Sequence, residues 1–176
     1  MLANNGLEER KMYTKIEDFA AEWTSEAELT ATVLDALTDD SLGQEVIEGR
    51  RVLGQIAWHL VQSLHYMTTL GLAFEASSRG EEAPDSAAFI ASEYRRISKN
   101  LLDAVQTQWN DESLRESVMI EKEAWQNGSS LRYTIMHQAH HRGQMTVLMR
   151  QAGLRVPNVY GPTYDTWVEK GITPLI

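Results

Sequence analysis

The sequence of 176 residues contains no cysteine, so disulfide bonds, zinc–thiolate sites and a cysteine nucleophile are excluded. It also lacks a long apolar run. A membrane span needs roughly 18 apolar residues, whereas the most apolar stretch, residues 56–74, is interrupted by His59, Gln62 and other polar side chains. The opening MLANNGLEERK has neither the basic flank nor the apolar core of a secretory signal. We therefore expect a soluble, cytoplasmic protein with no membrane partner.

Positive charge is scarce as well, with 16 lysine and arginine residues against 25 aspartate and glutamate residues and a formal net charge of −9. Binding to a nucleic-acid backbone needs a positively charged surface that replaces counterions. The basic clusters at residues 95–99 and 150–155 are too small to provide such a surface. We therefore expect no nucleic-acid partner.

Proline is rare, and three of the four prolines lie after residue 156. The preceding chain has apolar residues at steps of three and four, the period of an amphipathic helix, over residues 14–37, 51–74, 86–109 and 131–152. Residues 113–125 alternate and predict an extended crossover, and the tail from residue 154 carries aromatic side chains that we expect to be packed. The sequence thus predicts one all-α domain over residues 1–176: a four-helix bundle with a long crossover before the last helix and an irregular C-terminal tail.

Three of the five histidines lie in the stretch HQAHHRGQ, residues 137–144. At about 100° per residue, His137 and His141 lie about 40° apart and one turn along a helix, so their rings share a face and can bind one ion. His140 lies about 60° to the other side of His137, which suits a packing or supporting role. The spacing therefore predicts a pair of ligands rather than a cluster of three.

A catalytic metal site needs at least one further protein ligand. His59 lies on the apolar stripe of the helix expected over residues 51–74, whereas His65 points about 120° away from it. We therefore predict that His59, His137 and His141 form a three-histidine site between two facing helices. The alternative is that each is a hydrogen-bonded core histidine, although an unpaired buried imidazole costs about 1 to 3 kcal/mol.

Three neutral imidazoles favour Zn²⁺ or Ni²⁺ over Mg²⁺ or Ca²⁺ and leave at least one coordination position open. Ser63, Tyr66 and Gln144 lie on the ligand-bearing faces of the two helices, so they are candidate pocket residues; the alternative is that they only pack or bond to their neighbours. Arg142 is predicted to point away from the ligands and to form a structural ion pair or hold the C-terminal tail. No carboxylate can be assigned as a general base from the sequence.

The string HQAHHRGQMTVLMRQAGLRVPNVYGP, residues 137–162, closely resembles the C-terminal signature of the DinB/YfiT-like family. The string RVLGQIAWHL, residues 51–60, resembles the segment that carries the family's first histidine, and the resemblance extends over most of the chain. It implies a four-helix bundle, usually dimeric, with a divalent metal held by three histidines, which correspond to His59, His137 and His141. The resemblance thus implies the same ligand set as the helix geometry.

The resemblance also implies a small-molecule substrate, because members of the family transfer or add low-molecular-weight thiols or carry out other metal-dependent hydrolytic or isomerising steps. We therefore expect a metal-dependent transferase or hydrolase; the alternative is a non-catalytic metal-binding bundle of the stress response. A pocket beside polar groups would favour the enzyme, and a sealed site the alternative. A homodimer is also expected, because the second helix is apolar outside its core stripe, at Ala57, Trp58, Val61 and Leu64.

Overall fold

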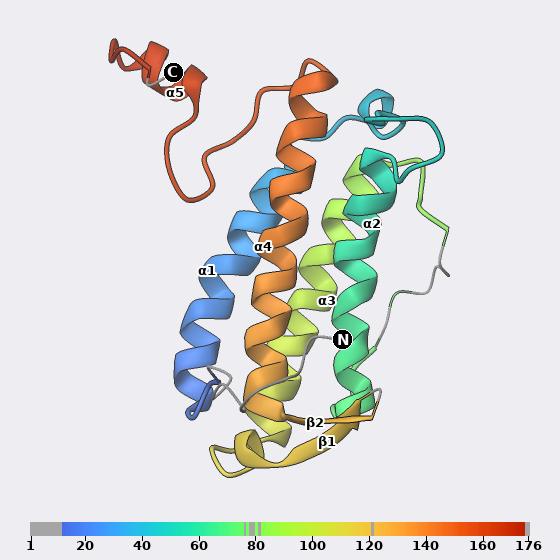
Figure 1. Ribbon diagram of the computed structural model, residues 1–176, viewed down its shortest axis with the longest axis vertical. Coiled ribbons are helices and arrows are strands. Elements are labelled where there is room, and N and C mark those ends of the chain that lie inside the picture. The colour runs from blue at the N-terminus through green and yellow to red at the C-terminus, as the bar shows by residue number, and fades with distance from the viewer. Residues whose placement is uncertain (1–11, 76, 78–79, 81, 121, 175–176) are drawn as a thin grey trace, which may run out of the picture.

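The computed structural model describes residues 12–75, 77, 80, 82–120 and 122–174. Four long helices form its body (Figure 1): α1 (Ile16–Asp35), α2 (Leu53–Ser63), α3 (Ala87–Gln108) and α4 (Asn127–Gln151). The shorter elements are the 3₁₀ helices η1 (Asp39–Ser41), η2 (Leu64–Leu70) and η3 (Ser113–Arg115), the strands β1 (Ser117–Ile120) and β2 (Glu123–Gln126), and α5 (Tyr164–Glu169). Each of α1 and α2 packs against both α3 and α4, so α1 and α2 occupy opposite corners of the bundle. The predicted all-α bundle is confirmed.

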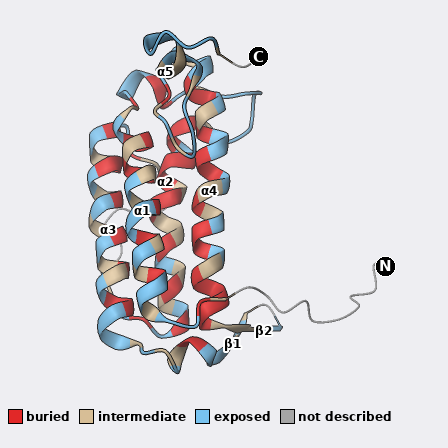
Figure 2. Cartoon of the chain, turned by 90° about the vertical axis from the view of Figure 1, so that its left-hand side faces the viewer, coloured by how far each residue is buried: buried red, intermediate tan, exposed pale blue. Residues whose placement is uncertain are grey.

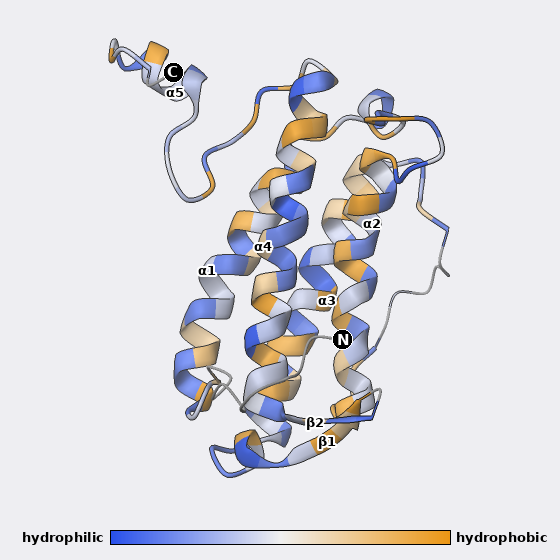
Figure 3. Cartoon of the chain, viewed as in Figure 1, coloured by the Kyte–Doolittle hydropathy of each residue, from blue (hydrophilic) through white to orange (hydrophobic). Residues whose placement is uncertain are grey.

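The apolar stripes of the four helices meet in a shared core, which Figure 2 shows as buried residues on the inward faces. Large aromatic side chains fill much of it: Phe19 and Trp23 of α1, Trp58 of α2 and Tyr94 of α3 are at most 1% exposed. Full burial of one apolar side chain contributes about 1.5–3 kcal/mol, so these inward faces hold the helices together. The outer faces are largely hydrophilic (Figure 3), and none of the described helices is both long and apolar enough to cross a membrane.

The second helix is shorter than the sequence pattern predicts. α2 ends at Ser63 and the chain continues as η2 to Leu70, where Gly71 with a φ of 92° ends it. The carbonyl oxygen of Leu60 accepts hydrogen bonds from Ser63 Oγ (3.2 Å) and from Gln138 Nε2 of α4 (3.1 Å). In a continuing α-helix this carbonyl would accept from the backbone only, so the side-chain donors favour the change from α-helix to 3₁₀ helix at this point. The periodicity of the sequence cannot predict a contact from another helix.

The long crossover lies between α2 and α3, whereas the sequence predicted it before the last helix. The connecting segment runs along the bundle (Figure 1): Ala73 N–H donates to Gln108 Oε1 (2.8 Å) at one end, and Ala87 N–H donates to Asp39 Oδ1 (2.8 Å) at the other. The segment before α4 is extended as predicted, but its two strands pair antiparallel with each other. The hairpin lies at the end of the bundle where α3 finishes and α4 begins, so this segment spans that end of the bundle and does not run along its length (Figure 1).

α4 begins at Asn127, directly after β2 and four residues before the predicted start of the last helix. The hairpin register places Ser117 opposite Gln126, and the helix follows at once. Gly128 in its first turn is required by a close approach, because a Cβ there would lie 2.1 Å from the carbonyl oxygen of Tyr13. Gly128 therefore lets the segment at Tyr13 pack against the start of α4.

The C-terminal tail contains the short helix α5, which the sequence did not predict, and is only partly packed. Val156 is buried as expected, whereas Tyr160 and Tyr164 are 67% and 64% exposed. α5 has no buried residue and projects away from the bundle (Figure 1). The aromatic side chains of the tail therefore do not all pack, and the tail is held by the polar contact of Tyr160 described below.

The four residues on which the expected dimer surface rested lie inside the bundle. Ala57, Trp58, Val61 and Leu64 are at most 1% exposed, because α3, α4 and the crossover cover α2 on several sides. Trp58 Nε1, for example, donates to the carbonyl oxygen of Gly80 in the crossover (3.1 Å). The predicted dimer surface is therefore wrong, while self-association itself stays a prediction.

Candidate metal centre

The three predicted histidines meet between α2 and α4. His59 lies in α2, and His137 and His141 lie one turn apart on α4. Nε2 of His137 is 3.3 Å from Nε2 of His59 and 3.1 Å from Nε2 of His141. Within the described part of the chain, this is the one group of histidine and carboxylate side chains whose ligand atoms, all within 4.8 Å of one another, can hold a metal ion.

The spacing of these nitrogen atoms matches a shared ion. Two imidazole nitrogens bound to one zinc ion at about 2.0–2.1 Å and tetrahedral angles lie about 3.3 Å apart, close to both observed separations. Nitrogen donors of this kind suit Zn²⁺ and Ni²⁺, whereas Mg²⁺ and Ca²⁺ prefer oxygen. The residues present therefore fit a divalent transition-metal ion.

Hydrogen bonding alone does not satisfy these nitrogens. Nδ1 of His141 lies 2.7 Å from Oε1 of Gln144, which can only accept, so the proton of neutral His141 is on Nδ1 and its Nε2 is an acceptor. His137 can donate from Nε2 to His141 or accept there from His59, but it cannot do both. At least one close contact between ring nitrogens is therefore left without a proton, whereas a cation bound by all three lone pairs satisfies them together.

Burial keeps the three imidazoles neutral. Desolvation lowers the pKa of His59 and of His137 to about 4, and the neighbouring imidazoles and Arg51 add to both shifts. Desolvation also lowers the pKa of His141, although its hydrogen bond to Gln144 opposes this effect. Metal ligands must be unprotonated, so this environment prepares the three residues to bind an ion below neutral pH.

These pKa values predict how the stability of the metal-free protein depends on pH. His59 and His137 have a pKa of 6.5 in the unfolded chain and of about 4 in the folded chain. Between these pH values the unfolded state therefore binds more protons than the folded state. The free energy of unfolding should therefore decrease as the pH falls from about 6.5 to about 4, with no contribution from these residues above about pH 7. Urea denaturation of metal-free protein across this range measures the decrease. The double variant His59→Gln/His137→Gln should show a shallower slope, and a slope equal to that of the unmodified protein would contradict the assignment.

The other two histidines lie outside the ligand set, as predicted. His65 is exposed, and its ring packs against Phe74 with 5.9 Å between ring centres. His140 Nε2 accepts from Gln144 Nε2 (3.1 Å), while Oε1 of Gln144 accepts the Nδ1 proton of His141. Gln144, predicted as a pocket residue, therefore bridges two histidines and holds His141 with Nε2 toward the other imidazoles, as partners of metal-bound histidines commonly do.

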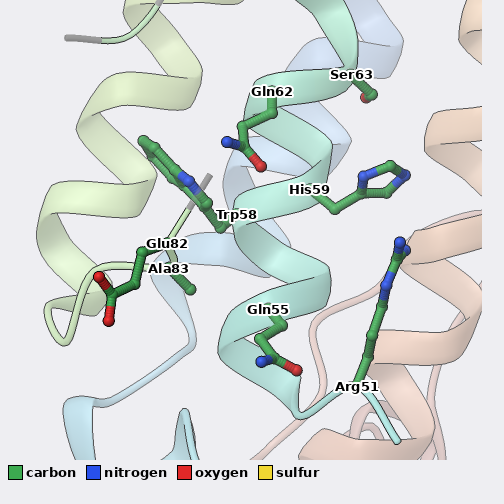
Figure 4. A pocket seen from close by; sticks show the side chains of 8 residues that line it. All are labelled: Arg51, Gln55, Trp58, His59, Gln62, Ser63, Glu82 and Ala83. Atoms are coloured by element: carbon green, nitrogen blue, oxygen red, sulfur yellow. The ribbon is translucent and has the colours of Figure 1, made fainter. Parts of the chain in front are cut away.

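Two cavities open beside the three histidines. The larger, of about 610 Å³, is lined by polar and charged side chains that include Arg51, Gln55, Gln62 and Glu82, together with His59 (Figure 4). The smaller, of about 240 Å³, is lined by His59, Ser63, Tyr66, Tyr133, Thr134 and His137. The structure thus brings Ser63 and Tyr66 to a pocket as predicted. Sequence reasoning did not single out Arg51 as a pocket residue; the available signal was an arginine just before the helix that carries His59.

Gln138 is a buried polar residue that sequence reasoning also missed. Its Nε2 donates to the carbonyl oxygen of Leu60 (3.1 Å) and to Ser63 Oγ (3.4 Å), and it follows His137 directly in the chain. The contact ties α4 to the last turn of α2 beside His59, so it fixes the two ligand-bearing helices relative to each other. The sequence could have indicated this role, because Gln138 lies between the two histidines of α4, on a face that packs against another helix.

Arg142 points to the other side of α4, as predicted. Its guanidinium pairs with the carboxylate of Glu26 of α1 and donates to Thr30 Oγ1 (2.7 Å) and to the hydroxyl of Tyr160. The Tyr160 hydroxyl in turn donates to Glu26 Oε2 (2.7 Å). The sequence left a structural ion pair and a hold on the tail as alternatives, and Arg142 makes both contacts. Within one turn of α4, His141 faces the candidate metal site and Arg142 fastens the helix to α1.

Comparisons with known proteins identify relatives that cover most of the chain and share its fold. The chain is 43% identical over 162 residues to the protein YrdA of Bacillus subtilis (strain 168), and the match covers 92% of this chain and 97% of YrdA. The crystal structure of a DinB-like protein from Bacillus cereus ATCC 10987 is 44% identical, with a TM-score of 0.81 over 85% of this chain and all of that one. A DinB-like protein of Bacillus subtilis, YjoA, shares only the fold, at 12% identity and a TM-score of 0.64, over 81% of this chain and 97% of its own. The model of the DinB family matches residues 12–172, which is most of the sequence. The chain therefore belongs to the DinB family.

Proposed function

We propose that this DinB-family protein is an enzyme that uses a divalent transition metal, Zn²⁺ or Ni²⁺, held by His59, His137 and His141. The reaction we propose is the transfer or addition of a thiol to a small electrophile, or the hydrolysis of a small molecule. Because the chain has no cysteine, a thiol must come from a cosubstrate, and a low-molecular-weight thiol is the candidate.

The observation that carries this proposal is the access to the ligand set. A structural metal site is closed by its protein ligands, whereas a catalytic site keeps a position open for substrate. His59 lines both cavities and His137 lines the smaller one, so a small molecule in either cavity lies against at least one of the proposed ligands. Polar groups of Ser63 and Arg51 lie in the same cavities. This arrangement favours catalysis over a sealed structural site.

Each group of the chain has a definite task in this proposal. The bound ion supplies a Lewis acid that polarises a substrate or lowers the pKa of a thiol or water. The three neutral imidazoles do not offset its charge, and Gln144 keeps the ring of His141 oriented. Burial raises the pKa of Tyr66, so its hydroxyl stays protonated and can donate a hydrogen bond to a substrate oxygen in the smaller cavity.

The test is a search for turnover that depends on the metal. Protein stripped of metal and reconstituted with Zn²⁺ or Ni²⁺ is assayed with a panel of low-molecular-weight thiols and electrophiles, such as glutathione with monobromobimane, and with small esters. We expect turnover that needs the ion, is lost in His141→Ala and is retained in His65→Ala. Stoichiometric metal binding without any metal-dependent turnover would contradict the enzyme and leave the non-catalytic metal-binding bundle as the function.

A further inference from the structure

Arg51 stands out among the charged side chains near the three histidines. It precedes α2 and lines the larger cavity, and Figure 4 shows its guanidinium extending toward the ring of His59. Within the described part of the chain, no carboxylate forms an ion pair with it. The same holds for Arg50, Arg115 and Arg150, but of these four arginines only Arg51 lines a cavity beside the histidines. An arginine with free donors at this place is suited to a ligand rather than to the fold.

The two cavities differ in chemical character, and His59 lines both of them. The smaller cavity is walled by the rings of Tyr66 and Tyr133, and the ring of His137 stacks on that of Tyr133 with 5.9 Å between ring centres. The larger cavity has Arg51 beside His59, while its one carboxylate among the lining residues, Glu82, lies on the other side of Trp58 in Figure 4. A ligand that reaches both cavities therefore passes His59, with a charged end on one side and an apolar end on the other.

From this placement we infer that the substrate is a small amphipathic acid whose anionic group binds Arg51 and whose apolar part lies between Tyr66 and Tyr133. The inference rests on the proposed function and names its substrate class. The guanidinium presents paired N–H donors that match both oxygens of a carboxylate, and such charge-assisted bonds are the strong ones. Because the chain as a whole carries a net charge of −9, this local positive charge selects for an anion that the rest of the surface repels.

The experiment uses three probes that separate charge from apolar contact: hydrocinnamate, its uncharged analogue hydrocinnamyl alcohol, and acetate. Isothermal titration of the Zn²⁺-reconstituted protein gives Kd for each, with the metal content of every sample measured alongside. We expect hydrocinnamate to bind about tenfold more tightly than the alcohol, and Arg51→Gln to remove that difference. Tyr133→Ala should weaken the acid and the alcohol by the same factor, because it removes only apolar contact.

Arg50→Gln is the matched control, since the neighbouring arginine carries the same charge but does not line the cavity. It should change Kd for hydrocinnamate by less than about twofold. Equal Kd values for Arg51→Gln and Arg50→Gln would overturn the inference, because the acid would then bind through the ion or through net charge alone. Equal Kd values for the acid and the alcohol would overturn it as well.

Repeating the titration on metal-free protein separates this inference from the proposed function. Binding of hydrocinnamate that Arg51→Gln weakens in the absence of the ion supports the anion site, even if no metal-dependent turnover is found. Metal-dependent turnover of uncharged substrates alone, with no effect of Arg51→Gln on Kd or on the rate, would support the enzyme and overturn the anion site.

Discussion

His141→Ala should abolish binding of the divalent ion, whereas His65→Ala should leave about one ion bound per chain. Removal of the His141 imidazole leaves His59 and His137, and two neutral nitrogens do not hold an ion against water and buffer. The loss should exceed the roughly 10–100-fold reduction in affinity that follows removal of a residue that only orients a ligand. His65 lies outside the site with its ring against Phe74, so its loss removes no ligand.

Elemental analysis after metal-free purification and reconstitution measures the stoichiometry, and competition with a chromophoric chelator measures the affinity. Gln144→Ala is the intermediate case: it keeps all three ligands but removes the acceptor for the Nδ1 proton of His141. Its affinity should fall between those of the unmodified protein and His141→Ala. Equal losses in His141→Ala and His65→Ala would show that the histidines were assigned wrongly, and no bound ion in the unmodified protein would rule out the site.

The three histidines could be predicted from sequence because their relation depends on continuous α-helix. His137 and His141 are one turn apart on α4, an α-helix without a break, so an angle of about 100° per residue correctly places both rings on one face. His59 lies before α2 changes to η2 at Leu64, so the same reasoning holds for it. The opposite orientation of Arg142 follows from the same geometry, and its partners confirm it.

The remaining features depend on contacts between segments that are distant in the sequence. The end of α2 depends on Gln138, which donates to the carbonyl of Leu60 from another helix. Residues 117–126 form a hairpin and not the predicted crossover because the two strands pair with each other, a choice that alternation along each strand does not reveal. The prediction of the dimer surface was wrong because it assumed that only one face of α2 is buried in the bundle. A helix with neighbours on several sides buries nearly its whole circumference. Arg51 was not singled out because a pocket is formed by the walls around it, and no local pattern describes them.

Arg142→Met should lower the free energy of unfolding by about 3–5 kcal/mol, the largest effect on stability that we expect from a single substitution outside the apolar core. The side chain of Arg142 is 1% exposed and that of its partner Glu26 is 11% exposed, so both charges are removed from water and depend on each other. Without the guanidinium, the Glu26 carboxylate remains buried with only the Tyr160 hydroxyl as a donor. The Thr30 hydroxyl also loses a donor, and the carbonyl oxygen of Glu26 keeps the Thr30 hydroxyl but loses its bond from Arg142.

Urea denaturation of metal-free protein measures this effect without a contribution from the ion. The control is Arg95→Met, which breaks the pair with Asp35, whose side chains are 45% and 51% exposed, and should cost about 0–1 kcal/mol. The double variant Glu26→Met/Arg142→Met should be more stable than Arg142→Met alone, because removing both charges leaves neither one buried without a partner. If Arg142→Met were no more destabilising than Arg95→Met, the buried pair would contribute no more to stability than a surface ion pair does, and other contacts would have to hold α1 and the tail against α4. Because Arg142 contacts α1 while His141 faces the other two histidines, Arg142→Met should also leave the stoichiometry of metal binding unchanged in protein that remains folded.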